Sequence, residues 1–402
     1  MLSAIPLLGA SYGVASSQSL ILNGQLQTGD VISAGTLDVV DQTDDTTNVV
    51  NATGNSLSGS VVSGSLEVQS TQAISGLASS DNRVTVAIDG GEAVVTSTAT
   101  TGNTLDVGIT GGGQLTGSYN QSSTGSTVYS HSQITGNAAR TTNMSASNQA
   151  IANSAGFGVT DSSADVSVVQ SNSATVNSDG GVIWQYITGQ ATLSSAAIGN
   201  NVTSATAGTT TQAISATQSN TSTLLQAAHW GAYGTSQDTV TSATATANNA
   251  NLTNTGGSLD TTVNQSNSSY VRAQAEETSF AYGGASSVAY GVGNSSLSGN
   301  QGPATFIDNT QTNTGLGIQS IANFSGNSGY DAQASSTAIG NAAAGYSCAN
   351  CQSTMQVRNN QTNSAGVGAT SSVTVSGSGR SSRNTTTAVG NTGSFYVTSP
   401  GP

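Results

Sequence analysis

Short stretches of alternating apolar and polar residues recur from one end of the chain to the other. Such alternation is typical of half-buried β-strands, because successive side chains of a strand point to opposite faces. No segment carries the apolar spacing of i, i+3, i+4 and i+7 that a long amphipathic helix requires. Glycine pairs and triplets separate the stretches and supply turns. The pattern therefore predicts an all-β protein. The clearest alternating stretches are residues 84–88, 166–168, 239–241 and 373–375.

Two short polar phrases repeat along the chain with a common period. The first is a small residue, then Gly or Ala, then Asn, and its asparagines are 46 to 50 residues apart. The second is Gln-(Ser/Thr)-Asn, and its glutamine follows the asparagine of the first phrase by 17 to 20 residues. Two phrases that recur with the same period and a nearly constant offset indicate a repeat protein. The asparagines are Asn55, Asn103, Asn153, Asn200, Asn248, Asn294, Asn341 and Asn391, and the glutamines are Gln72, Gln121, Gln170, Gln218, Gln265, Gln311 and Gln361.

We interpret the repeat as a β-solenoid, similar to a β-helix, built from about seven 48-residue units. A unit of this length is long for a narrow coil, so we expect two coils of about 24 residues per unit, and about fourteen coils would span roughly 70 Å. A single wide coil or a pair of hairpins per unit are the alternatives. In either stack, equivalent amides lie above one another and form hydrogen-bonded ladders. An unpaired buried amide costs about 1–3 kcal/mol, so we assign these Asn and Gln residues a structural role.

The repeats predict four segments along the chain. Residues 1–15 are small and apolar, and we expect them to be the remnant of a signal peptide, with a β-strand as the alternative. Residues 16–50 are expected to form an N-terminal cap or docking segment, residues 51–391 the repeat solenoid, and residues 392–402 a C-terminal tail.

Composition narrows the classes of function. Only 6% of the residues are charged, the net charge is −13, and none of the cationic side chains is a lysine. Nucleic-acid binding requires clustered Lys and Arg and is therefore excluded. The acids gather near the N-terminus, where either a solvated acidic face or a weak divalent-cation surface accounts for them. They include Asp38, Asp41, Asp44 and Asp45.

Candidate catalytic and metal-binding residues are few. His131 and His229 lie about two periods apart and lack cysteine or paired-carboxylate partners at metal-ligand spacing. Asp161 and Asp165 are the nearest carboxylate pair, and an alternating strand accounts for them as solvent-facing. We therefore expect no catalytic residue, no cofactor and no metal site.

Two further features are the cysteines and the aromatic residues. Cys348 and Cys351 form a lone Cys-x-x-Cys, for which we expect a local disulfide in an oxidising exterior. Large aromatic residues also fall about one period apart and predict an aromatic stack, either inside the coil or on an exposed face where it could pack on sugar rings. They are Trp184, Trp230, Phe280 and Tyr330.

The amide phrases in a Gly/Ser/Thr/Ala background resemble those of curlin-type secreted fibre subunits, although the period here is about twice as long. In length, absence of lysine and unit layout, such as residues 338–341 followed by 360–363, the chain is more similar to holdfast anchor protein D of stalked alphaproteobacteria. This resemblance implies a secreted protein of the cell surface, associated with the outer membrane, that fastens an adhesive polysaccharide at the cell pole or stalk tip. It also implies export through a curlin-type lipoprotein pore and a small curlin-like partner protein.

Three functions follow as hypotheses. The first is a structural anchor that holds adhesive polysaccharide through many weak contacts. The second is a curlin-like amyloid subunit that self-assembles through open solenoid ends. The third is a β-helical enzyme that degrades polysaccharide, with carboxylates assembled across coils.

Overall fold

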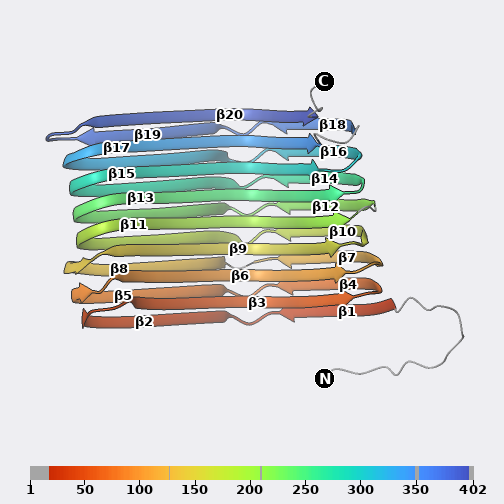
Figure 1. Ribbon diagram of the computed structural model, residues 1–402, viewed down its shortest axis with the longest axis horizontal. Coiled ribbons are helices and arrows are strands. Elements are labelled where there is room, and N and C mark those ends of the chain that lie inside the picture. The colour runs from red at the N-terminus through yellow and green to blue at the C-terminus, as the bar shows by residue number, and fades with distance from the viewer. Residues whose placement is uncertain (1–17, 126, 209–210, 349–352, 398–402) are drawn as a thin grey trace, which may run out of the picture.

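The computed structural model describes residues 18–125, 127–208, 211–348 and 353–397, and there the chain is a β-solenoid of stacked parallel strands. Figure 1 shows each coil as a flattened loop in two layers. In the first coil, β1 (Gln18–Gln27) and β2 (Val31–Gln42) follow one another in one direction, and β3 (Thr46–Val62) returns beside them. The expected all-β solenoid is confirmed.

The strands form two sheets. The shorter strands make an eight-stranded sheet, with one strand from each coil: β1, β4 (Ser65–Ile74), β7 (Gln114–Ser123), β10 (Ser163–Asn172), β12 (Gln212–Asn220), β14 (Leu259–Asn267), β16 (Ala304–Asn313) and β18 (Thr354–Asn363). The other sheet contains β2, β3, β5 (Ala78–Gly90), β6 (Ala93–Thr110), β8 (Thr127–Thr141), β9 (Asn143–Thr160), β11 (Thr175–Gly208), β13 (Leu224–Gly256), β15 (Tyr270–Asn300), β17 (Gly317–Ser347), β19 (Val367–Val375) and β20 (Ser381–Val397).

Each 48-residue period is one wide coil. Asn200 pairs with Asn248 across β11 and β13, and Gln170 pairs with Gln218 across β10 and β12. Residues about 24 positions apart do not share a register position. The expectation of two coils per unit is therefore wrong, and the single wide coil is the alternative that the structure adopts.

The wide coil changes the shape expected of the molecule. Eight coils about 4.8 Å apart stack to roughly 34 Å between the first and last strands, about half of the height predicted for fourteen. The longest axis of the molecule runs along the strands and not along the stack (Figure 1). The solenoid is therefore a broad, thin plate with two large faces.

The core between the two layers is thin, and its composition varies along the coil. Large apolar side chains pack between the short strands and the return strands, including Leu66 on β4 and Leu105 on β6. The middle of the plate is filled mainly by alanines such as Ala197 and Ala245. A third cluster, around Trp184, fills the far end of the first five coils. Small side chains in the middle let the two layers approach closely, which suits a chain with few large apolar residues.

The small residue before each phrase asparagine lies where neighbouring coils are in close contact. The register of β11 and β13 passes from the pair Ile198 and Thr246 to the pair Asn200 and Asn248, and it skips position 199. A Cβ atom on Gly199 would lie 2.5 Å from the carbonyl oxygen of Ala247. The structure thus explains why Gly or Ala precedes Asn in every repeat.

The predicted segments fall on the structure as follows. Residues 1–15 lie outside the described residues. Residues 18–50 form β1, β2 and the start of β3, and residues 392–397 continue β20. Among the described residues, no helix is long and apolar enough to cross a membrane.

Candidate functional site: amide columns and a corner groove

The eight phrase asparagines form one column through the plate, and the first seven of them are buried. Each of the first seven donates a side-chain hydrogen bond to the Oδ1 atom of the asparagine in the next coil toward the C-terminus, over 2.7–2.8 Å. The same Nδ2 group also donates to a carbonyl oxygen of a short strand in that next coil, as Asn200 does to Ser219 at 2.9 Å. Each asparagine therefore joins two coils and two layers.

The seven phrase glutamines form a second column, beside the first. Each donates to the Oε1 atom of the glutamine one coil nearer the N-terminus, over 2.7–2.9 Å. Each also donates to a backbone carbonyl of the return strand in its own coil, as Gln218 does to Asn249 at 2.8 Å. The two columns thus donate in opposite directions along the stack, and both hold the layers together.

Sequence reasoning missed two parts of this system. Gln25 extends the glutamine column into the first coil, where it accepts the bond from Gln72. It lies 47 residues before Gln72, so the period itself was the signal. The last asparagine of the Gln-(Ser/Thr)-Asn phrase also forms a column, with side-chain bonds of 2.6–3.3 Å that join Asn172, Asn220, Asn267, Asn313 and Asn363.

The predicted aromatic stack does not form. Trp184 is buried in the core and pairs in register with Tyr233, whereas Trp230 is half-buried on the outer face and pairs with Glu276. Phe280 is 67% exposed and Tyr330 is 61% exposed, at different register positions near the turn of the long strands. The coils differ in length by a few residues, so equal spacing in sequence did not mean equal position in the coil.

The ionisable residues inside the plate are enclosed. His229 Nδ1 lies 2.9 Å from Ser195 Oγ, and burial lowers the pKa of this histidine to about 4. Glu277 accepts hydrogen bonds from Thr239 and Thr241, and burial raises the pKa of its carboxyl to about 7. The His229 and Glu277 side chains are each 1% exposed, so neither of them can contact a polymeric substrate.

The remaining candidate residues lie apart from one another. His131 Nδ1 is 3.6 Å from an Asp179 carboxylate oxygen. Asp161 lies at the bend after β9 and Asp165 on the outer face of β10, and both face solvent. No group of three His, Cys, Asp or Glu that could hold a metal occurs among the residues described. The predicted disulfide involves Cys351, which lies outside the described residues.

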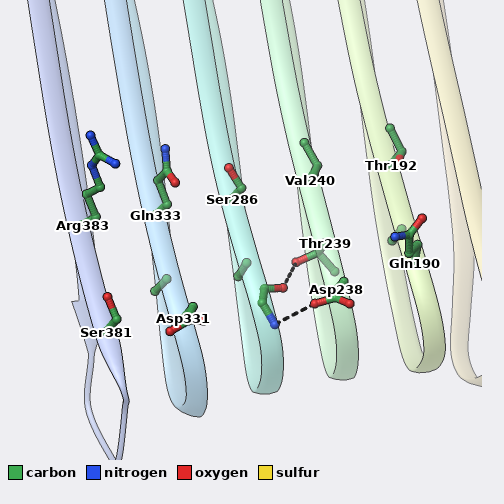
Figure 2. A pocket seen from close by; sticks show the side chains of 14 residues that line it. Gln190, Thr192, Asp238, Thr239, Val240, Ser286, Asp331, Gln333, Ser381 and Arg383 are labelled. Carbon is green, nitrogen blue, oxygen red and sulfur yellow. Dashed lines mark hydrogen bonds between the residues drawn. The ribbon is translucent and has the colours of Figure 1, made fainter.

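A shallow groove crosses the outer surface beside the turn of the long strands. Its volume is about 380 Å³, and it runs over five successive coils, from β11 to β20 (Figure 2). Two columns of outward-facing positions line it. One column contains Gln190, Asp238, Gly284, Asp331 and Ser381, and the other contains Thr192, Val240, Ser286, Gln333 and Arg383. We call this the corner groove.

The corner groove is hollow because Gly284 has no side chain between Asp238 and Asp331. Asp238 accepts a hydrogen bond from the Gly284 backbone N–H at 3.1 Å. Asp331 is paired with Arg380, and this hydrogen bond lowers the pKa of the Asp331 carboxyl. Hydroxyl and amide groups supply most of the other polar atoms. Such a lining offers at least one polar side chain in each coil, which suits a long, polyhydroxylated ligand.

Comparison with known proteins identifies one family. The model of the family described as holdfast attachment protein D matches residues 40–317, which are 278 of the 402 residues. No curated protein and no solved structure matches the chain.

Proposed function

Since this chain belongs to the holdfast attachment protein D family, we propose that it anchors an adhesive polysaccharide, the holdfast, to the outer membrane or the stalk tip. The family match carries this proposal. The family is one of attachment proteins and not of enzymes, and its role is associated with the cell surface. The binding of the polysaccharide and the location at the outer membrane or stalk tip are part of the proposal.

The plate supports an anchoring role in two ways. Its coils are joined by side-chain columns as well as by backbone ladders, which suits a protein that must resist pulling. Its surface also repeats the same side-chain positions every coil, so a polymer can make many weak contacts at once. Such multivalent binding holds strongly even where each contact is weak.

The corner groove is the part of the surface that we assign to the polysaccharide. It offers hydroxyl, amide and carboxylate groups along five coils. The contacts are hydrogen bonds for the most part, so the binding they provide depends less on salt than binding by ion pairs does. Val240 and the backbone of Gly284 add an apolar floor on which the face of a sugar ring can lie.

Export and docking belong to the same proposal. The proposed partners of this protein are a curlin-type lipoprotein pore in the outer membrane and a small curlin-like anchor protein. These partners rest on the family resemblance. An enzymatic role has less support, because the paired Ser195 and His229 and the buried Glu277 are closed off inside the plate.

A cell-based experiment tests the proposal. In a strain that lacks this protein, holdfast should be shed into the medium and should remain on surfaces after cells are washed away. Wild-type protein should restore retention, whereas the groove variant Thr192→Ala, Asp238→Ala, Gln333→Ala should not.

The matched control changes one outward column of the short sheet instead, with Thr71→Ala, Asn120→Ala and Asn264→Ala. These side chains are exposed and lie on a different strand set. If the adhesive stays cell-bound in the deletion strain, the anchoring proposal is rejected. If both triple variants retain it equally, the corner groove is not the binding surface.

A further inference from the structure

The two ends of the plate leave three strands each with a single neighbour. Among the described residues, β1, β2 and β3 pair only with the second coil, and β18, β19 and β20 pair only with the seventh. The outer edge of each such strand carries backbone N–H and C=O groups without a strand partner. Edges of this kind are templates for another chain. The question is which chain fits them.

The two end coils have the same layout. Gln25 corresponds to Gln361 and Asn55 to Asn391, and both pairs are separated by 336 residues (361 − 25 and 391 − 55). The same offset places Val31, the first residue of β2, opposite Val367, the first residue of β19. β1 and β18 have 10 residues each, and β3 and β20 have 17 each, whereas β2 has 12 and β19 has 9. A second copy can therefore continue the stack without a shift of register in any strand.

The amide columns end with complementary groups. At the C-terminal end, the Nδ2 group of Asn391 donates no bond and the Oε1 atom of Gln361 accepts none within the described residues. At the N-terminal end, Asn55 Oδ1 accepts none, and Gln25 Nε2 donates only to the carbonyl of Ser56. If the C-terminal coil of one copy meets the N-terminal coil of another, Asn391 donates to Asn55 and Gln25 donates to Gln361. A join between two N-terminal ends would place acceptor against acceptor in the asparagine column.

Apolar side chains at the two ends also match. Under the same offset, Val357 lies over Ile21, and Val373 lies over Leu37. Ile21, Leu37 and Val373 are partly buried against the core, and Val357 is 37% exposed. Phe395 lies over Gly59, while its other side is against Gly345 in its own chain. The aromatic ring would thus fill space that two glycines leave free.

The two ends carry opposite charge. Five of the acids, Asp30, Asp38, Asp41, Asp44 and Asp45, lie in the first coil, and residues 18–62 contain no arginine. Three of the six cationic residues, Arg358, Arg380 and Arg383, lie in residues 353–397, which contain no acid. The common offset places Arg380 opposite Asp44. Opposite potentials steer two such surfaces together and disfavour joins between like ends.

We propose that a second copy of this chain occupies the open end of the plate, head to tail, with the C-terminal coil of one copy on the N-terminal coil of the next. Such an interface is heterologous and does not close, so it generates a fibre. Eight coils about 4.8 Å apart give an axial repeat of roughly 38 Å per copy. This inference does not depend on the polysaccharide proposal.

Complementary charge variants test the join on the purified full chain. The first variant is Asp41→Arg, Asp44→Arg, Asp45→Arg, which changes the charge of residues 18–62 from −5 to +1 and so makes both ends positive. The second is Arg380→Asp, Arg383→Asp, which makes both ends negative. Circular dichroism should first show that each is folded, as expected for exposed side chains. Arg83→Asp, in the second coil, is the control for net charge, since Arg83 lies between Thr36 of the first coil and Gln133 of the third and not at an open end of the plate.

Association is measured by analytical ultracentrifugation and electron microscopy at low salt. Wild type and Arg83→Asp should form fibres with the axial repeat given above. Each end variant alone should need a concentration higher by about tenfold or more to assemble. An equal mixture of the two end variants should assemble again, because each positive end then meets a negative one.

Two results would overturn the inference. Wild-type protein that stays monomeric as concentration rises would show that the ends do not join. A mixture that assembles no better than the separate variants would show that the join is not head to tail. Retention of holdfast by cells is measured in a separate experiment. A negative result in the assembly experiment therefore does not contradict the anchoring proposal.

Discussion

Asn200 and Asn248 lie in adjacent coils, and the side-chain amide of Asn200 donates to the side-chain oxygen of Asn248 over 2.8 Å. Both residues are fully buried. Because the bond joins like side chains one coil apart, the column is satisfied only if every coil supplies an amide at this position. The repeated asparagine in the sequence thus reflects a continuous column of side-chain hydrogen bonds in the structure.

Removal of one amide should weaken the plate. In Asn200→Ala, the Nδ2 group of Asn153 loses its acceptor, and the carbonyl of Ser219 loses its donor. Buried polar groups left unpaired cost about 1–3 kcal/mol each, so the denaturant midpoint should fall clearly. Asn264→Ala is the matched control, since that amide is exposed, and it should change the midpoint little. Equal midpoints for the two variants would contradict the structural role of the column.

Because Gly199 is in close contact with the next coil, we expect the loss of stability to grow with the size of the side chain at this position. Alanine already occupies the equivalent positions 152 and 247, so Gly199→Ala should be tolerated with a small loss of stability. Gly199→Val adds branches where the Ala247 carbonyl already crowds the Cβ position, and overpacking costs about 1–3 kcal/mol or more. Thermal unfolding of the two variants checks this. A valine variant as stable as the alanine variant would show that the coils can separate locally.

Glu277 should make stability fall as pH rises. Its pKa is about 7 in the folded protein and 4.5 as the ordinary value. Between these values the unfolded chain loses the proton and the folded chain keeps it, so ionisation favours unfolding. The difference corresponds to roughly 3 kcal/mol, developed between about pH 4.5 and pH 7. Glu277→Gln should be more stable than wild type at pH 8 and similar at pH 4, as measured by denaturant unfolding. Parallel pH profiles for the two proteins would refute this.

His229 should act in the opposite direction. Burial lowers its pKa from 6.5 to about 4, so the unfolded chain binds a proton that the folded chain does not. Stability from this source is present above about pH 6.5 and is lost as pH falls toward 4. In wild type this loss partly cancels the gain from protonated Glu277. The acid-side fall should therefore be steeper in Glu277→Gln than in wild type, and a shallower fall would contradict the assignment.

The sequence was sufficient for the fold class and for the repeat, because Asn and Gln at fixed spacing reflect side chains that must meet. It was not sufficient for the winding of the chain. A period of 48 residues fits one wide coil or two narrow ones, and only the pairing of Asn200 with Asn248 distinguishes them. The two phrases do not divide the period into equal halves, and this unequal spacing already favoured one wide coil. In the structure, Gln170 and Asn200 lie on different sheets of the same coil.

Side chains outside the phrases were harder to place. Trp184 and Trp230 are one period apart in sequence, yet they differ in register by three residues and point to opposite faces. The coils absorb length differences at the turn of the long strands, where β11 shifts register between Ile187 and Gln190. The corner groove forms beside that turn, from residues with no common motif. Only coordinates could bring Asp238, Gly284 and Asp331 together.

The opposed donation of the two main amide columns has an electrical consequence. Every side-chain amide is a dipole, and a row that donates in one direction adds its dipoles together, as the peptide units of a helix do. In this plate the asparagine row and the glutamine row point opposite ways, so their sums largely cancel. Each row can still strengthen its own bonds by mutual polarisation. A longer plate, or a fibre of many plates, would therefore gain cohesion while the dipoles of these two rows stay balanced along its length. The shorter row that joins Asn172 to Asn363 donates in the asparagine direction and alone adds to the field.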